Sequence, residues 1–476
     1  MKVKESRLFN IIALVGIFLL VENTWARAQI SGSKKPNIIY VMADDLGYGD
    51  LGSYGQQKIK TPHLDQMAAE GMRFIQHYAG STVCGPSRAS LLTGKHMGHA
   101  SLRGNPRWTS VGKPVDMPAD EVTVAEELKR AGYATGIVGK WGLAEAGLEF
   151  MPLYQGFDYF YGFRKHLTAH NYYPEILWEN NAPFHPEGND KETKSGQYSH
   201  DSVTSKAFHF IEQNQENPFF LYLAYTIPHY ELTVPSDAKE PYQKLDWEER
   251  KMRAKQGSYY HDPDGNVTYA AMVSRMDRDM GRLFTLLKTL GIDENTLVIF
   301  TSDNGHEYDR GFFNSNGPLK GHKRDLYEGG IRMPFIARWP GKIEPGSVND
   351  HLSAFWDFLP TACDIAGVPP SRDVDGISYL PTLLGREQED HEYLYWEFNE
   401  RQGPIQAIRK GNWKAVKFYK KPTELYDLSK DLGEENNVAN KYGDVVAELE
   451  PLFTKARQDN PYFPLAPHPR VANKFK

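Results

Sequence analysis

The sequence predicts an α/β fold with a large, mostly parallel central sheet, followed by a smaller C-terminal antiparallel sheet packed with a helix. Uninterrupted apolar runs at 37–43, 218–225 and 296–301 indicate strands that are buried on both faces, as in a parallel sheet. Stretches with helical periodicity alternate with these runs, which is typical of α/β architecture. After about residue 385 the pattern changes to short strands separated by tight turns.

The predicted elements follow one another along the chain in the order that this architecture requires. The first strand, 37–43, is followed by helices at 64–71 and from 87, a helix at 122–131 and a strand at 134–138. A strand at 218–225, a long amphipathic helix at 267–290 and a strand at 296–301 complete the larger part. The smaller part has strands at 393–398, 405–409, 413–418 and 424–428 and one helix at 444–456. We therefore expect an N-terminal domain over 29–385 and a C-terminal α+β subdomain over 386–476. Polar segments at 180–199 and 239–264 are expected to be surface insertions that shape a substrate cleft.

The first 28 residues have the pattern of a cleavable export signal. Lys2, Lys4 and Arg7 precede an apolar run over 11–21, and Ala26-Arg27-Ala28 has the small-x-small pattern of a cleavage site. The run is shorter than the roughly 20 residues that a membrane-spanning helix needs, so no stable membrane insertion is expected. This pattern predicts a protein of the periplasm or the extracellular medium.

Composition excludes some partners and leaves the cysteines open. The formal net charge is −6, which argues against non-specific binding to nucleic acid. The chain has two cysteines, Cys84 and Cys363, too few for a disulfide framework. They can form a single bridge or remain free thiols, and the residues around Cys84 favour a chemical role.

Oxygen-bearing side chains follow two of the predicted buried strands. Asp44 and Asp45 come after the first strand, and Asp303 and Asn304 come after the strand at 296–301. Ligands bind beyond the carboxyl ends of the strands in open α/β sheets. Three carboxylates and an amide suit Ca²⁺, with Mg²⁺ as the second choice, better than they suit zinc. The alternative is that these residues only cap turns and helices.

Five sequence blocks, in order, carry a resemblance to a known family. They are Pro36–Gly47, Cys84-Gly-Pro-Ser-Arg88 with Leu92-Thr-Gly94, Gly132–Trp141, Lys323–Arg332 and Glu424–Leu428. Together they resemble the signatures of the type I sulfatases, and in particular the arylsulfatase-like bacterial enzymes that are secreted to degrade polysaccharides. The resemblance implies an alkaline-phosphatase-like sandwich and hydrolysis of sulfate esters. It also implies that a maturation enzyme oxidises Cys84 to Cα-formylglycine.

The resemblance assigns roles to residues in these blocks and to one histidine. It implies that Ca²⁺ is held by Asp44, Asp45, Asp303 and Asn304, with the residue made from Cys84 beside them. It implies that Arg88 holds the formylglycine side chain and that Lys140 and Lys323 bind sulfate. It further implies that His229 contacts the leaving-group oxygen, where it can act as a general acid.

One position departs from the family pattern. The family usually has a histidine two residues after the lysine at 140, and this chain has Gly142. In the family that histidine contacts the formylglycine hydroxyl. We expect another side chain to occupy the space, with His306 favoured over His99 because it directly follows the Asp303-Asn304 pair.

The substrate side is predicted from loops near the motifs. His99, Arg103, His170 and His306, together with three aromatic residues, are candidates for contacts with a sulfated oligosaccharide or polysaccharide; the aromatic residues are Trp108, Trp178 and Tyr230. Packing within the loops is an equally good explanation for them. Two other functions stay open here: a phosphatase or phosphodiesterase of the related fold, and a non-catalytic protein that binds sulfated glycans.

Overall fold

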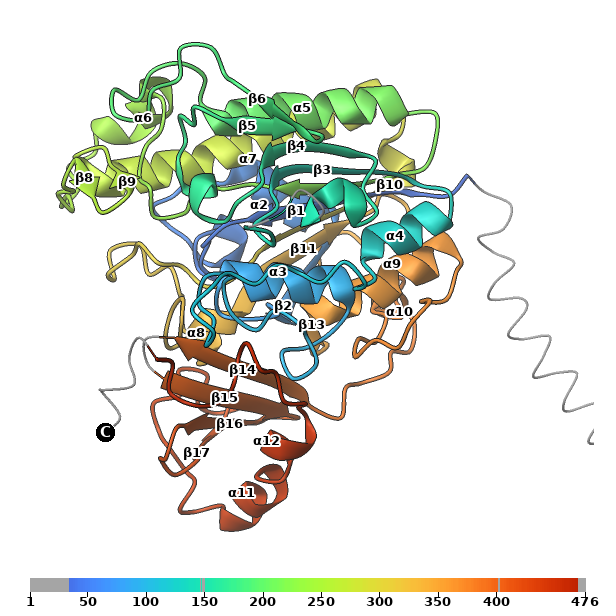
Figure 1. Cartoon of the computed structure of the whole chain (residues 1–476), viewed down its shortest axis with the longest axis vertical. Helices are drawn as coiled ribbons and strands as arrows, with labels where there is room; N and C mark the ends of the chain where they lie inside the picture. Colours follow the sequence, from blue (N-terminus) through green and yellow to red (C-terminus); the bar gives the residue numbers. More distant parts are fainter. Residues whose placement is uncertain (1–33, 146, 148–149, 401–402, 470–476) are drawn as a thin grey trace, which may run out of the picture.

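The computed structural model describes residues 34–145, 147, 150–400 and 403–469, so the predicted export signal lies outside the described residues. Two sheets dominate these residues: a central sheet within a helical sandwich and a small C-terminal sheet below it in Figure 1. No helix in the described part of the chain is both long enough and apolar enough to cross a bilayer.

The central sheet has eleven strands, and its middle is parallel. Strands β10, β1, β7, β3 and β4 lie side by side in parallel, and antiparallel or short strands extend both edges. The antiparallel pairing of β11 with β10 and β2 was not predicted. The strand bounds are β1 Asn37–Ala43, β2 Met72–Tyr78, β3 Ala134–Lys140, β4 Tyr159–Phe163, β5 Leu177–Glu179, β6 Ala182–Phe184, β7 Phe219–Ala224, β10 Thr296–Ser302, β11 Arg332–Arg338, β12 Ser347–Asn349 and β13 Ser353–Ala354.

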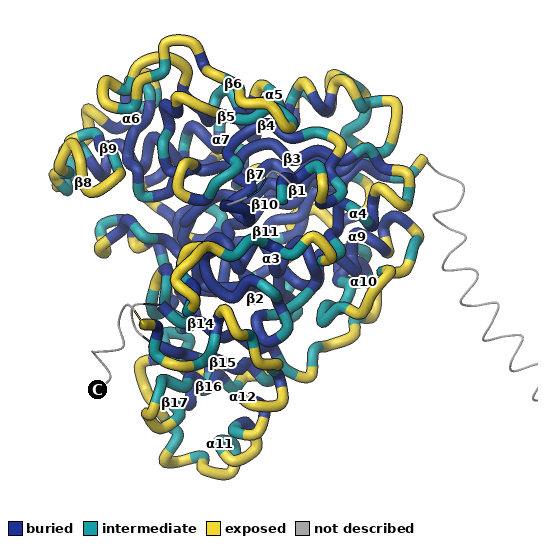
Figure 2. Tube along the Cα trace, in the orientation of Figure 1, coloured by how far each residue is buried: buried dark blue, intermediate teal, exposed yellow. Residues whose placement is uncertain are grey.

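Helices cover both faces of this sheet, which explains the uninterrupted apolar runs of its strands. In β1, Ile39 and Val41 pack into the core beneath α2, α5 and α7, whereas Ile38 and Tyr40 pack into the core beneath α3, α4 and α9. Figure 2 shows the strands as the most buried part of the molecule. The bounds are α2 Pro62–Glu70, α3 Cys84–Thr93, α4 Val124–Arg130, α5 Ser199–Asn214, α6 Ser236–Gln243, α7 Gly265–Thr289, α8 Glu328–Ile331, α9 Phe358–Ala366 and α10 Leu380–Leu383.

The C-terminal sheet is antiparallel, as predicted. Its order is β14 Leu394–Glu400, β15 Gly403–Lys410, β16 Trp413–Phe418 and β17 Glu424–Asp427. The single helix expected over 444–456 is wrong: the structure has α11 Gly443–Leu449 and α12 Leu452–Lys455. Pro451 separates them, because proline has no N–H to donate to the preceding helical turn. The fold class is therefore confirmed, with this break as a local correction.

The segment 239–264 contains one further pair of strands. They are β8 Lys255–Gln256 and β9 Tyr259–Tyr260, which form a two-stranded antiparallel ribbon, called the β8–β9 hairpin below. The hairpin projects beside α6 at the left of Figure 1. The segment predicted to be an insertion is thus an ordered structure on the sandwich.

Candidate active site

The acidic cluster is assembled by two parallel strands in register. Ala43 of β1 pairs with Ser302 of β10, so the residues that follow each strand emerge side by side at one edge of the sheet. The backbone N–H of Asp45 donates to Oδ1 of Asp303 at 3.2 Å, and Nδ2 of Asn304 donates to Oδ1 of Asp45 at 2.6 Å. All four side chains, Asp44 included, are buried. The structure therefore brings the four predicted metal ligands together.

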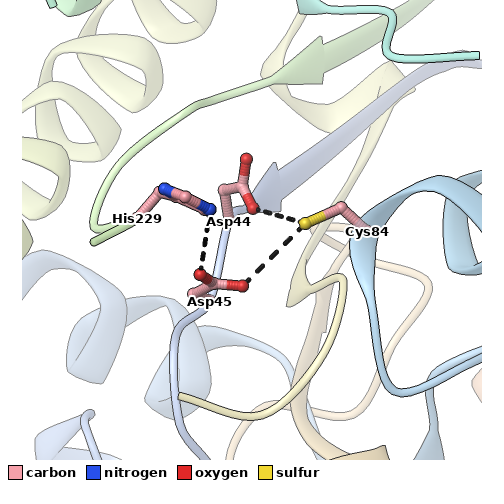
Figure 3. Close-up of side chains that lie close together, drawn as sticks. All are labelled: Asp44, Asp45, Cys84 and His229. Atoms are coloured by element: carbon pink, nitrogen blue, oxygen red, sulfur yellow. Dashed lines mark hydrogen bonds and ion pairs between the residues drawn. The ribbon is translucent and has the colours of Figure 1, made fainter. Parts of the chain in front are cut away.

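Cys84 lies against this cluster as the first residue of α3. Its Sγ is 3.1 Å from Oδ1 of Asp44 and 3.9 Å from Oδ1 of Asp45 (Figure 3). The N-terminus of a helix carries unpaired N–H groups and a positive dipole end, which favours an anion next to it. One turn later, Nε and Nη2 of Arg88 both donate to Oδ2 of Asp303, at 2.9 and 2.7 Å. Helix α3 therefore carries two of the predicted catalytic side chains into the cluster.

Two buried lysines complete the charged part of the site. Lys140 ends β3, and its Nζ is 2.6 Å from Oδ2 of Asp44. Lys323 comes from the loop between β10 and α8, and its Nζ is 2.7 Å from Oδ2 of Asp45. A buried ammonium group needs a charged partner, and each lysine has one of the acidic residues. They place two fixed positive charges beside the carboxylates and Cys84.

Histidines form one wall of the site. Nε2 of His229 is 3.4 Å from Oδ2 of Asp45 and 3.3 Å from Nζ of Lys323. The ring of His170 stacks on that of His229, with centroids 3.7 Å apart, and its Nε2 is 3.4 Å from Nζ of Lys140. Among the described residues, Nδ1 of neither histidine has a hydrogen-bond partner. The wall thus presents two buried polar atoms that are available to a ligand.

The electrostatics of the cluster fit a bound cation. Burial, together with Asp44, Glu307 and Asp303, raises the pKa of Asp45 to about 7, even though Lys323 lowers it. Burial and Asp44 also raise the pKa of Asp303. The amide oxygen of Asn304 is buried and, within the described part of the chain, accepts no hydrogen bond. Hard oxygen atoms with unmet demand for positive charge are the donor set that Ca²⁺ or Mg²⁺ takes.

The space at Gly142 lies beside a histidine that the sequence did not single out. A Cβ at Gly142 would be 3.4 Å from Cε of Lys140 and 3.8 Å from Nδ1 of His166. That Nδ1 is buried and has no partner among the described residues, and the His166 ring lies 4.9 Å from the His170 ring. His166 directly precedes a short 3-10 helix, Leu167–His170. Its spacing of four residues from His170 was the signal that could have revealed it.

Three predicted substrate residues make their contacts elsewhere. Nδ1 of His99 is 2.8 Å from Asp375, beyond the end of α3 opposite to Cys84. The guanidinium of Arg103 is buried and donates to Glu397 of β14 at 2.9 Å. The ring of His306 lies 6.0 Å from that of His322, and burial lowers its pKa to about 4. These positions do not place their side chains against Cys84, so their substrate roles stay predictions.

The predicted aromatic residues are also spread over the surface around the site. Trp108 packs edge-on against His468, with ring centroids 5.0 Å apart, and the guanidinium of Arg164 lies 4.9 Å from the ring of Trp178. Tyr230 follows His229 in the chain, and the ring of Tyr259, on the β8–β9 hairpin, lies 5.8 Å from it. Tyr259 also lies 6.0 Å from the ring of His229. No motif or spacing in the sequence indicates Tyr259, because only the folding of the hairpin brings it there.

The two cysteines are not bonded to each other. Both Cys84 and Cys363 are free and buried, so the alternative of a single disulfide is wrong. Cys363 lies on α9 within the core, whereas Cys84 faces the acidic cluster. Chemistry at Cys84 therefore remains open to its thiol.

Comparisons with known proteins agree with this geometry. The model of the sulfatase family matches residues 36–368, and a model described as the C-terminal part of N-sulphoglucosamine sulphohydrolase matches residues 321–459. Human arylsulfatase A is 33% identical to this chain, with 91% of this chain and 90% of the relative aligned. An N-acetylgalactosamine-6-O-sulfatase of Bacteroides thetaiotaomicron is 30% identical, with 95% of this chain and 99% of the relative aligned.

Solved structures give the same result. The crystal structure of Ps i-CgsB in complex with a neocarrahexaose superposes with a TM-score of 0.77 at 29% identity and covers 93% of this chain and 97% of its own. A phosphonate monoester hydrolase of Agrobacterium radiobacter shares the fold alone, with a TM-score of 0.63 at 22% identity, 88% of this chain and 96% of that chain being covered. The central sandwich is therefore of the alkaline-phosphatase-like type. The chain belongs to the sulfatase family and is an enzyme that hydrolyses sulfate esters.

Proposed function

We propose that this sulfatase is exported and removes sulfate from a sulfated oligosaccharide or polysaccharide, with a nucleophile made from Cys84. The observation that carries the proposal is the position of Cys84. It lies between an acidic cluster and two buried lysines, 3.1 Å from Asp44. A sulfate ester is an anion, and Lys140 and Lys323 supply the positive charge that its oxygens need. In the same cluster, Cys84 offers a position from which an oxygen nucleophile can reach the sulfur.

The nucleophile is proposed to be Cα-formylglycine, made from Cys84 by a maturation enzyme. Its hydrated aldehyde supplies two hydroxyl groups on one carbon, one to attack sulfur and one whose deprotonation releases sulfate. Arg88 is bound to Asp303 through two nitrogens and therefore holds its guanidinium in one orientation beside residue 84. Lys140 and Lys323 orient the sulfate, and His229, on the other side of Asp45, is placed to give a proton to the departing oxygen.

The acidic cluster is proposed to hold one Ca²⁺, with Mg²⁺ as the second choice. Asp44, Asp45, Asp303 and Asn304 would be its ligands, next to the side chain made from Cys84. When bound, the ion supplies positive charge to the sulfate oxygens and acidity to the attacking hydroxyl. The unpartnered amide oxygen of Asn304 and the raised pKa of Asp45 support a cation at this place.

The carbohydrate substrate and the export are supported by the relatives and by the leader sequence. Relatives along most of the chain are named for N-acetylgalactosamine 6-sulfate, and one structural neighbour was solved with a neocarrahexaose. The N-terminal pattern over 1–28 predicts release into the periplasm or the medium. We keep the boundary near 385 as the division between the catalytic domain and the C-terminal subdomain; it falls between α10 and β14.

Mature protein and a Cys84→Ala variant test the proposal together. We expect the intact mass of the active protein to be about 18 Da below the unmodified value, because formation of an aldehyde exchanges sulfur for oxygen and removes two hydrogens. Cys84→Ala should lose sulfate release by more than about 10³-fold while its melting temperature stays close to that of the wild type. Elemental analysis should find one Ca²⁺ per chain. Wild-type turnover in Cys84→Ala would overturn the proposal, as would two zinc ions in active protein.

A further inference from the structure

A positively charged pocket lies next to the active site, on the side of His229. It has a volume of about 270 Å³ and is called the basic pocket below. The chain as a whole has a net charge of −6, so a pocket with three cationic side chains is not a reflection of overall composition. Its lining residues are Tyr230, Arg250, Lys251, Met252, Arg253 and Gln256.

Two tyrosines connect the basic pocket to the active site. Tyr230 lines the pocket and directly follows His229 in the chain. The ring of Tyr259 packs against both, with centroids 5.8 Å from Tyr230 and 6.0 Å from His229. Gln256, on the other strand of the β8–β9 hairpin, accepts a hydrogen bond from the Tyr230 hydroxyl at 3.5 Å. The pocket is therefore separated from His229 by aromatic rings, on whose faces a sugar ring can pack.

The cations of the basic pocket are not neutralised by the protein. In the described ranges, no carboxylate lies within ion-pair distance of Arg250, Lys251 or Arg253. The guanidinium of Arg250 donates to the backbone carbonyl of Tyr308 and lies 4.8 Å from that ring, which fixes its orientation without cancelling its charge. The neighbouring Glu249 accepts from backbone N–H groups at the start of α7 instead. Lys251 and Arg253 are exposed.

We propose that the basic pocket binds a second anionic group of the substrate, a sulfate or carboxylate on the sugar next to the one that loses its sulfate. This inference rests on the proposed function and narrows it: the substrate class is a glycan with acidic groups on consecutive sugars. Guanidinium groups bind planar or tetrahedral oxyanions through several hydrogen bonds, and a lysine adds a point charge. Tyr259 and Tyr230 support the sugar between the two anionic groups.

Charge removal with a matched control tests the proposal. The variant Lys251→Ala/Arg253→Ala removes two exposed positive charges from the basic pocket. The control Lys288→Ala/Lys342→Ala removes two exposed positive charges from the end of α7 and the segment after β11, at the opposite edge of the sheet. The substrates are an aryl sulfate and N-acetylgalactosamine 6-sulfate linked to a neutral sugar, to a uronate or to a sulfated sugar. KM and kcat are measured for each protein.

We expect the pocket variant to raise KM about five-fold for the substrates with a second anionic group, with kcat unchanged. KM for the aryl sulfate and for the neutral disaccharide should not move, and the control should match the wild type throughout. A larger effect with the sulfated than with the uronate disaccharide would assign the pocket to sulfate, and the reverse to carboxylate. Because these charges are exposed, the difference should shrink at high salt.

Equal KM values in the wild type and the pocket variant for every disaccharide would overturn the inference while leaving the sulfatase function intact. Binding separates the two levels further. A chondroitin sulfate tetrasaccharide is titrated into Cys84→Ala with and without the pocket substitutions. If the wild type releases sulfate from none of the sugars, the proposed function fails. The titration then decides the inference alone: a loss of affinity of about five-fold supports it, and unchanged affinity overturns it.

Discussion

At the scale of single residues, the site depends on buried charges that are held against one another. Asp44 accepts from Lys140 and lies beside Cys84, and Asp45 accepts from Lys323. Because burial penalises each charge alone, removal of one partner leaves another uncompensated. Substitutions here therefore change both chemistry and stability, and the useful tests compare substrates rather than bare activity.

His229 provides the first comparison of this kind. We expect His229→Ala to lower kcat/KM on sugar sulfates by about 10²-fold or more and to affect aryl sulfates much less. A phenolate leaves without a proton, whereas a sugar alkoxide does not. The two losses are measured side by side at the same pH. An equal loss on both substrates would show that His229 binds sulfate or supports the fold.

His166 provides the second, because it lies where Gly142 leaves room. We expect His166→Ala to reduce turnover of both substrate types by about 10-fold or more, since a buried imidazole with a free Nδ1 beside Lys140 would be lost. Gly142→His in the same variant should restore part of the rate by returning an imidazole to this space. Full activity of His166→Ala would mean that the ring only fills space.

At the scale of elements, the edge strands of the central sheet carry a buried histidine with a consequence for pH. His77 of β2 lies on Phe335 of β11, with ring centroids 4.0 Å apart, and its Nδ1 is 2.9 Å from the Ser353 hydroxyl. Burial lowers the pKa of His77 to about 3. The unfolded chain therefore binds a proton below about pH 6.5 that the folded chain does not, and this histidine makes the protein less stable as the pH falls.

The prediction is a difference in slope between the wild type and His77→Gln. From pH 7 to pH 5 the wild type should lose about 2 kcal/mol more of its free energy of unfolding than the variant, because the variant lacks the titrating group. Urea unfolding of both proteins at the two pH values gives the comparison, and an overall cost of the substitution cancels in it. Identical slopes would show that the folded protein accommodates a protonated His77.

At the scale of the whole molecule, the C-terminal sheet is joined to the sandwich through buried contacts. Trp396 of β14 packs against Trp356, and its indole N–H donates to the carbonyl of Ala79. Arg103 donates to Glu397 of β14 and to the carbonyl of Gln458. A sheet that is fixed in this way can support the loops around the site without contributing the nucleophile.

This joint distinguishes the two explanations of Arg103. We expect Arg103→Ala to lower the free energy of unfolding by about 3 kcal/mol, since it leaves Glu397 with a buried charge that has lost a partner. KM for sugar sulfates should stay unchanged below the melting transition. Chemical unfolding and steady-state kinetics on the same preparation measure both quantities. A raised KM with wild-type stability would instead return Arg103 to the substrate-binding residues.

The sequence predicts those parts of this protein that depend on neighbours in the chain. Apolar runs identify the buried strands, and parallel strands end at one edge, so the sequence alone is enough to expect Asp44 and Asp303 side by side. The motif around Cys84 indicates the chemistry for the same local reason. The helix at 444–456 is wrong only where Pro451 interrupts it.

Contacts between distant segments are a different matter, because no local pattern encodes which loops meet. His166 reaches Gly142, and Tyr259 reaches His229, only after the parallel sheet and the β8–β9 hairpin have brought those segments together. Arg103 has the composition of a binding residue but is buried against Glu397, 294 residues away in the chain. Burial and pairing across the fold therefore assign these side chains to the site wall, to the basic pocket or to the joint between the sheets.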